Sequence, residues 1–98
     1  MAAIREVVAS DYERLALFLK NHGRRKKSPQ EWLSRFLGWW EANPAFSESK
    51  TPRGWILLVA DSIKGFIGVI PVEMWVNGEI KILLSITTWR VSDDHRIN

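Results

Sequence analysis

The segment from Ile80 to Val91 changes the phase of its apolar residues partway along, and this pattern restricts what the chain can fold into. Large apolar residues occupy the even positions at first and then move to odd positions at Trp89 and Val91. Side chains of a strand alternate between two faces, so one inserted residue produces such a slip. We therefore predict a β-bulge near Thr87 and Thr88 that keeps the apolar side chains on one face. The alternative is a strand that ends at Thr87.

The Asn77-Gly78 pair joins this segment to a second long strand pattern, residues 66–76. Both residues of an Asn-Gly pair tolerate positive φ, so the pair predicts a tight hairpin. A third apolar run, residues 54–61, precedes it across the short connection 62–65. The three runs predict an antiparallel meander, with a bulge or distortion around Pro71, because proline cannot donate to a sheet ladder.

The first half of the chain predicts one strand followed by two helices. Residues 3–8 alternate as a short strand with Ile4 and Val8 facing inward, and Ser10 with Glu13 forms a capping-box pattern for a first helix. Its apolar stripe consists of Tyr12, Leu15, Ala16 and Leu19. Ser28 and Pro29 then predict the start of a second helix.

The second helix has an unusually wide apolar face and stops before Pro44, since the residue before a proline avoids the helical region. Residues 44–52 are polar and predict a loop. The apolar face consists of Trp32, Leu33, Phe36, Leu37 and Trp40, with Trp39 at its margin. The order of elements predicts an α+β fold in a single domain, 1–98.

Composition excludes several classes of function. The 98 residues include no cysteine and only two histidines, His22 and His95, without clustered carboxylates, so we expect no metal site. We recognise no export signal or membrane span and expect a cytoplasmic protein. The basic run Arg24–Lys27 predicts a solvated turn, with nucleic-acid binding as the less favoured alternative.

The bulged strand leads into Val91 and Arg96, which have the spacing V-x-x-x-x-R. With the order of elements, this pattern resembles the N-terminal part of the GCN5-related N-acetyltransferase (GNAT) superfamily. Asp93 stands where that family commonly has proline. In the family the arginine opens a glycine-containing loop that binds the pyrophosphate of the cofactor at a helix N-terminus. The 98 residues stop before those glycines, so we expect a chain that is weakly active or inactive alone.

The resemblance implies acetyl transfer from acetyl-CoA to an amine. By position, Trp89 and Val91 match the backbone that binds the pantetheine arm, and Arg96 matches the start of the pyrophosphate loop. Glu73 is the candidate general base. The alternative for Glu73 is an exposed strand residue that balances Lys81 across the hairpin.

Three tryptophans, Trp39, Trp40 and Trp75, are candidates for an acceptor pocket. The competing interpretation is that aromatic residues at helical spacing form the core. Each interpretation implies a different environment for the indole rings.

A different class of function follows from the strand 79–91 itself. An apolar edge strand recruits another strand or aggregates. The alternative to an enzyme is therefore a non-catalytic module that associates with a second copy or another chain through this strand.

Overall fold

The computed structural model describes residues 2–22 and 27–92. The elements follow the order β1 (Ala2–Glu6), η1 (Ala9–Asp11), α1 (Tyr12–His22), α2 (Pro29–Phe36), η2 (Leu37–Glu41), β2 (Gly54–Val59), β3 (Ser62–Val76) and β4 (Glu79–Val91). This order confirms the predicted α+β fold of one strand, two helices and three antiparallel strands.

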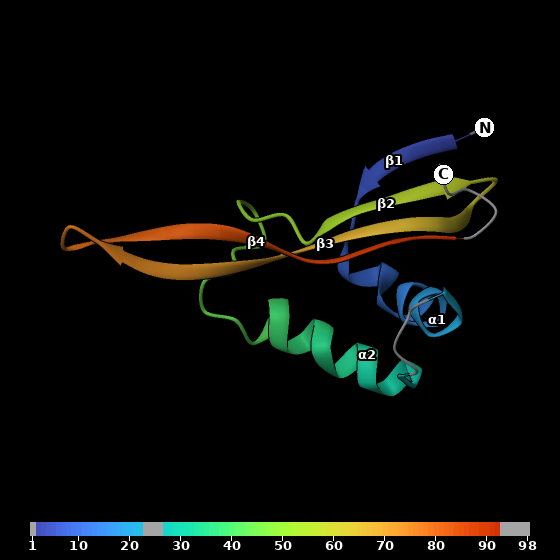
Figure 1. Cartoon of the computed structure of the whole chain (residues 1–98), viewed down its shortest axis with the longest axis horizontal. Coiled ribbons are helices and arrows are strands. Elements are labelled where there is room, and N and C mark those ends of the chain that lie inside the picture. Colours follow the sequence, from blue (N-terminus) through green and yellow to red (C-terminus); the bar gives the residue numbers. More distant parts are fainter. Residues whose placement is uncertain (1, 23–26, 93–98) are drawn as a thin grey trace.

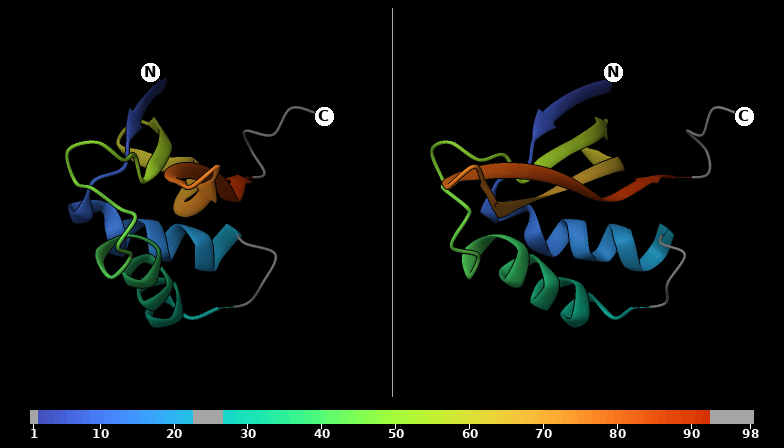
Figure 2. Two further views of the ribbon diagram at one scale, coloured as in Figure 1. Left: turned by 90° about the vertical axis from the view of Figure 1, so that its left-hand side faces the viewer. Right: turned by 60° about the vertical axis from the view of Figure 1, so that its left-hand side comes forward.

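The four strands form one antiparallel sheet in the order β1-β2-β3-β4. Both helices lie on the same face of this sheet, and the opposite face carries no helix of the described residues (Figures 1 and 2). The outer parts of β3 and β4 extend well beyond the helices, as an arm along the longest axis of the molecule (Figure 1). The principal extents, 47 × 27 × 26 Å, reflect this arm.

The helices bury the predicted stripes. Every residue of the α1 stripe is buried, as is Phe18. On α2 and η2 the buried line runs through Trp32, Phe36 and Trp40, while Leu37 is 51% exposed, contrary to expectation. At 100° per residue, a stripe centred on that line turns toward Trp39 and leaves Leu37 at its outer margin.

The helix starts differ in how well the sequence predicts them. Ser28 accepts a hydrogen bond from the Glu31 backbone N–H, and Glu31 accepts one from the Ser28 N–H, so α2 begins with a capping box. The expected Ser10–Glu13 box is replaced by a 3₁₀ turn in which the Asp11 carboxylate accepts the Val8 N–H at 2.9 Å.

The burial of β1 corrects the predicted phase of the first strand. Ile4 is 73% exposed, because it lies opposite Leu57 on the face without helices. Val8 is 45% exposed, and Val7, one residue past the end of β1, is buried in the core instead. Pairing with β2 decides which face of the sheet each β1 side chain takes, and the alternation within residues 3–8 does not contain this information.

Two tight turns connect the last three strands. Asn77 and Gly78 have φ of 51° and 79°, which confirms the predicted hairpin. The turn between β2 and β3 consists of Ala60 and Asp61, with φ of 49° and 64°. The segment 62–65, predicted as the connection, belongs to β3 instead.

The predicted bulge in the last strand is confirmed. Gly68 pairs with Thr88 and Val69 pairs with Ile86, which leaves Thr87 as the extra residue, and β4 continues to Val91. Because residues opposite each other share a face, the bulge keeps Trp89 on the same face as Ile86. Both side chains are 65% exposed, so this common face is not buried within the chain.

Pro71 costs the sheet no hydrogen bond. It pairs with Leu84 on β4, and its carbonyl accepts the Asn43 side-chain amide at 2.9 Å on the opposite edge. That edge lies beyond the end of β2, so the proline nitrogen faces no strand there. The nearest irregularity is the bulge between Gly68 and Val69.

Candidate functional site

The candidate site begins at the free edge of β4, just past the bulge. The Ser92 N–H donates to the Lys64 carbonyl at 2.8 Å, so the backbone of Ser92 faces β3. Successive residues of a strand alternate in direction, and therefore the N–H groups of Val91 and Trp89 face outward. Among the described residues, β4 is the last strand of the sheet and no further strand uses these donors.

Beside this edge, the sheet face without helices has a shallow hollow of about 110 Å³. Trp89 and Val91 line it, together with Trp55, Leu57 and Ile67 from the two neighbouring strands. Its floor includes Gly65, where an added Cβ would lie 3.3 Å from the Cβ of Leu57. A side chain at position 65 would therefore fill the hollow that the glycine leaves open.

The structure separates the candidate base from this hollow. Glu73 lies opposite Ile82, seven residues along β4 from Trp89. At about 3.3 Å per residue, that separation is about 20 Å. Its side chain is exposed, and residues opposite each other share a face, so Glu73 and Lys81 lie on opposite faces of the hairpin. Lys81 forms its ion pair with Glu79 instead, at 3.0 Å.

The three candidate acceptor tryptophans occupy different environments. Trp40 is fully buried, and its indole N–H donates to the Val69 carbonyl at 2.8 Å. Trp39 is half-buried, with its ring 5.6 Å from that of Trp40. Trp75 is 71% exposed beside the hairpin turn, and no ring contact of the described residues joins it to the other two.

Several candidates from the sequence lie outside the described residues. Arg96, expected to open the pyrophosphate loop, is one of them, and so is His95. The same holds for most of the basic run, residues 24–26. The predictions made for these residues stay predictions.

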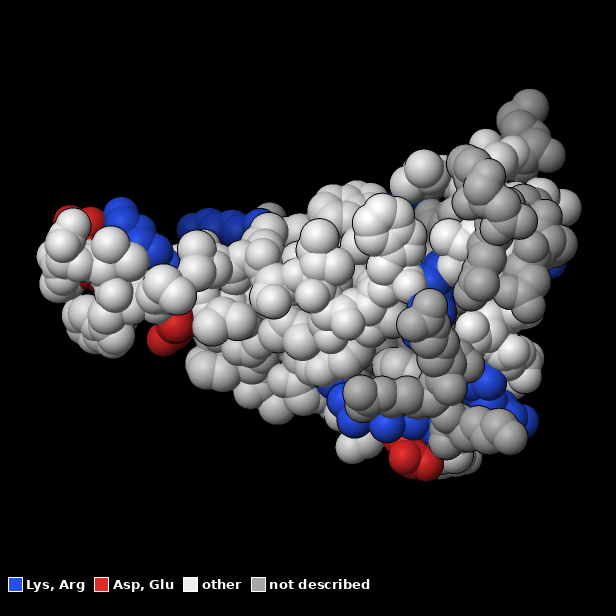
Figure 3. All heavy atoms as spheres, viewed as in Figure 1, with Lys and Arg blue, Asp and Glu red and all other residues white. Residues whose placement is uncertain are grey.

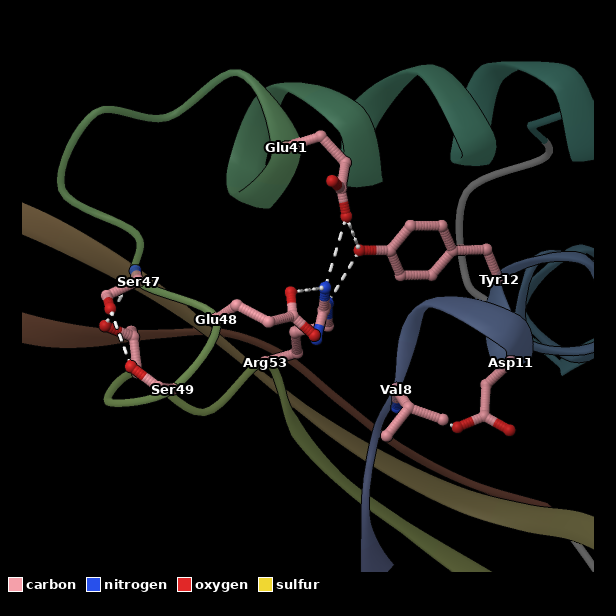
Figure 4. Close-up of polar contacts among 9 residues, drawn as sticks. Val8, Asp11, Tyr12, Glu41, Ser47, Glu48, Ser49 and Arg53 are labelled. Atoms are coloured by element: carbon pink, nitrogen blue, oxygen red, sulfur yellow. Dashed lines mark hydrogen bonds and ion pairs between the residues drawn. The ribbon is translucent and has the colours of Figure 1, made fainter.

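A polar cluster that the sequence did not suggest joins the start of α1, the end of η2 and the loop before β2 (Figure 4). Its centre is Arg53, which is 4% exposed and donates from Nε to the Tyr12 hydroxyl at 2.7 Å. Arg53 also reaches the carboxylates of Glu48 at 2.6 Å and Glu41 at 3.2 Å, and its guanidinium lies 4.8 Å from the centre of the Phe46 ring. We call these residues the Arg53 cluster.

Burial and hydrogen bonds within the Arg53 cluster shift the pKa values of Tyr12, Glu41 and Arg53. Burial raises the pKa of Tyr12 to about 12, and the hydrogen bond that its hydroxyl donates to Glu41 at 2.7 Å adds to this effect. That hydrogen bond, with the one from Arg53, lowers the pKa of Glu41. Burial alone would lower the pKa of Arg53, but its hydrogen bonds to Glu48, Tyr12 and Glu41 raise it. Near neutral pH Tyr12 therefore stays neutral while Glu41 and Arg53 stay charged, and their hydrogen bonds hold the loop before β2 against α1 and η2.

A larger and more open hollow of about 280 Å³ lies between α1 and the β2–β3 turn. Arg14 crosses it and donates to the Asp61 carbonyl. Its other polar side chains include Asn21, His22 and Ser62. This hollow is far less apolar than the one beside Trp89, and it lies against α1.

The described residues were searched for a metal site and for a membrane-spanning helix. Among them, no three His, Cys, Asp or Glu side chains gather as a metal would require. No described helix has the length and apolar character needed to cross a membrane.

Comparison with known proteins gives the fold. No family model matches the sequence, and no curated protein matches it. A structure described as a possible acetyltransferase from Clostridium difficile 630 aligns with 98% of this chain, at 15% identity and a TM-score of 0.59. A transcriptional regulator from Bacillus halodurans C-125 aligns over the same share, at 15% identity and a TM-score of 0.58.

The alignments cover 60% and 63% of those two chains, so this chain spans less than two thirds of their length. At this level of identity the match is one of fold. The expected resemblance is therefore confirmed for the architecture: the chain shares its α+β fold with part of a structure described as a possible acetyltransferase.

Proposed function

We propose that this chain carries the cofactor-binding edge of an acetyl-CoA-dependent N-acetyltransferase, located at β4 beyond the bulge. The observation that carries the proposal is the pair of outward N–H groups of Trp89 and Val91 beside the apolar hollow. The pantetheine arm of acetyl-CoA is a chain of amides, which can pair with a free strand edge as an added strand would. The hollow suits the apolar segments between those amides.

The chemistry of the bound group is acyl transfer from a thioester. An amine nitrogen forms a bond to the carbonyl carbon, the carbon–sulfur bond breaks, and the proton lost by the amine balances the thiolate that leaves. Donors held in place at the strand edge would stabilise charge on the carbonyl oxygen without reorganising. Trp89 and Val91 belong to a paired strand, which holds their N–H groups in fixed directions.

The other residues expected in the site differ in how close they lie to the β4 edge. Arg96 follows the described edge in sequence and would extend the cofactor contact toward the pyrophosphate. Glu73, about 20 Å along the strand from Trp89, has no part in this contact. Trp39 and Trp40 support the helix side of the sheet, and the acceptor amine and a cytoplasmic location stay predictions.

The test is an isothermal titration of the 98-residue chain with acetyl-CoA. We expect saturable binding between micromolar and low-millimolar strength. Val91→Pro removes one outward N–H at an edge position that tolerates proline, and it should weaken binding about tenfold. Val91→Ile keeps the N–H and serves as the matched control.

Free pantetheine should bind the same edge more weakly, because it lacks the nucleotide and its phosphates. Circular dichroism of each variant establishes that the sheet is intact. A folded wild-type chain that gives no heat at millimolar acetyl-CoA would contradict the proposal. Equal binding by Val91→Pro and Val91→Ile would place the cofactor elsewhere.

A further inference from the structure

We propose that the arm formed by β3 and β4 beyond the bulge, residues 69–86, is a self-association surface whose occupant is a second copy of this chain. The inference does not depend on acetyl-CoA binding. It rests on the side chains of one face of the arm, on the total exposed area of the chain and on the charges that the arm carries.

One face of the arm is a continuous apolar strip. Pairing across the hairpin places Trp75 opposite Ile80, and alternation along β4 places every second residue after Ile80 on the same face. These side chains are between 48% and 71% exposed. We call them the apolar strip, and its members are Trp75, Ile80, Ile82, Leu84 and Ile86. Uncharged residues make up most of the surface of the arm in the space-filling view (Figure 3).

The other face of the arm is different in character. Near the turn it carries Met74 opposite Lys81 and Val76 opposite Glu79, so charged and apolar groups face each other there. Farther from the turn Val72 lies opposite Leu83, and the apolar side chains of this face are 41% to 45% exposed, less than those of the strip. Lys81 and Glu79 form an ion pair there at 3.0 Å, and both side chains are more than half exposed. A surface ion pair of this kind suits contact with water. We therefore assign association to the apolar strip and leave the second face to solvent.

The area that the chain exposes matches what a second copy would cover. The accessible surface is 6684 Å². A compact monomer of 11.4 kDa would expose about 5,800 Å², which leaves an excess of about 900 Å². A stable interface of standard size buries about 800 Å² per partner. The radius of gyration, 14.4 Å, likewise exceeds the value of about 12.6 Å for a compact chain of this length.

The charges of the arm favour a copy over an unlike partner. Residues 70–86 hold two glutamates and one lysine, so the arm has no strong charge for an acidic or basic partner to match. An isologous contact places the same patch on both sides of a two-fold axis, and an uncharged strip is complementary to itself. Glu73 belongs to β3, whereas four of the five strip residues belong to β4. The contact can follow β4 and leave Glu73 at its rim.

Packing of face on face explains these observations better than pairing at the edge. If two β4 strands only joined edge to edge, the side chains of the apolar strip would still stand in water on both copies. Two sheets that pack face to face bury their facing side chains in a layer about 10 Å thick. The strip residues, 48% to 71% exposed, are side chains of this kind.

The test compares two neighbouring residues of similar exposure on opposite faces of β4, Ile82 and Leu83. Sedimentation velocity of the wild-type chain should show a dimer at micromolar concentration. Ile82→Glu places an unpaired carboxylate on each side of the contact and should raise the dimer dissociation constant at least ~30-fold. Leu83→Glu should leave it within a few-fold of wild type.

A second measurement avoids dependence on the charged variants. The chain has no cysteine, so a single introduced one reports its own contacts. Sheets packed face to face lie about 10 Å apart, which is beyond the reach of a disulfide, so a short bismaleimide is the cross-linker. It should join two copies of Ile82→Cys into a covalent dimer, whereas Leu83→Cys should remain monomeric under denaturing conditions.

Three results would overturn the proposal. A wild-type chain that is monomeric at high-micromolar concentration would assign the apolar strip to another occupant. Equal loss of the dimer in Ile82→Glu and Leu83→Glu would show that the contact is not confined to the strip. Cross-linking through Leu83→Cys alone would place it on the second face. Acetyl-CoA titrations of the same samples keep this outcome separate from that of the proposed cofactor site.

Discussion

The body of the molecule and its arm both contain large apolar residues, but the body buries these side chains and most of the arm exposes them. Under the sheet, Leu15, Phe36 and Trp40 are removed from water entirely, and the buried Arg53 is paired with two carboxylates and a hydroxyl. On the arm, residues as large and as apolar stand about half exposed. The difference shows that an apolar pattern alone does not produce burial: the helices cover one face of the body, and no described helix covers the outer part of the arm, residues 72–86.

The largest expected difference between the two regions comes from two tryptophans. Trp40→Ala should lower the free energy of unfolding by about 3–5 kcal/mol, because the fully buried ring leaves a cavity and its hydrogen bond to Val69 is lost. Trp75→Ala should change it by less than about 0.5 kcal/mol. Urea unfolding at a concentration where the chain is monomeric measures both, and similar losses would show that the arm is packed within one chain.

A smaller difference is expected for two cations. Arg53→Met should cost about 1–3 kcal/mol, because the hydroxyl of Tyr12 and the carboxylates of the cluster lose a buried donor. Lys81→Met removes an exposed pair with Glu79 and should cost less than about 0.5 kcal/mol. The same urea titration decides the matter, and an Arg53→Met variant as stable as Lys81→Met would mean that the cluster does not fasten the loop.

The smallest expected difference between the two regions concerns their carboxylates, Asp11 in the body and Glu73 on the arm. Hydrogen bonds from Arg5 at 2.7 and 2.8 Å hold the pKa of Asp11 below its ordinary value of 3.8, so the ionised form is favoured by folding. The resulting stabilisation is present above pH 3.8 and is lost as the pH falls through the lower pKa of the folded state. Asp11→Asn should remove this part of the acid loss and cost about 1–2 kcal/mol at neutral pH.

Thermal unfolding followed between pH 2 and pH 7 tests the Asp11 prediction, and Arg5→Gln should flatten the same part of the profile. An Asp11→Asn profile that matches wild type in acid would show that the Arg5–Asp11 pair does not contribute to stability.

For the arm, Glu73→Gln should change the free energy of unfolding at neutral pH by less than about 0.5 kcal/mol, because the side chain is exposed.

Local patterns predicted the features that depend on a few adjacent residues. The Asn77-Gly78 turn, the Ser28 cap and the bulge at Thr87 are all as expected, since each follows from φ preference, side-chain reach or strand periodicity. The candidate edge at Trp89 and Val91 was found in the same way, with the family resemblance supplying its meaning.

Other features depend on residues far apart in the chain, and local patterns predicted them wrongly or did not predict them at all. Ile4 faces away from the core because Leu57 does, and Tyr12 meets Arg53 across 41 residues. No spacing near Tyr12 or Arg53 indicates the cluster. Glu73 and Lys81 are close in the hairpin, but their register puts them on opposite faces.

The sequence by itself determined the order of the elements, the two-residue turn at Asn77 and the slip of phase in β4, because these are set by backbone preferences and by side-chain alternation over short distances. Only the tertiary structure decided which apolar face is covered. The helices lie on one side of the sheet and end before the arm begins, so equal patterns become core in one place and exposed surface in the other. Burial is a property of what packs against a strand, and a strand's own residues do not encode it alone.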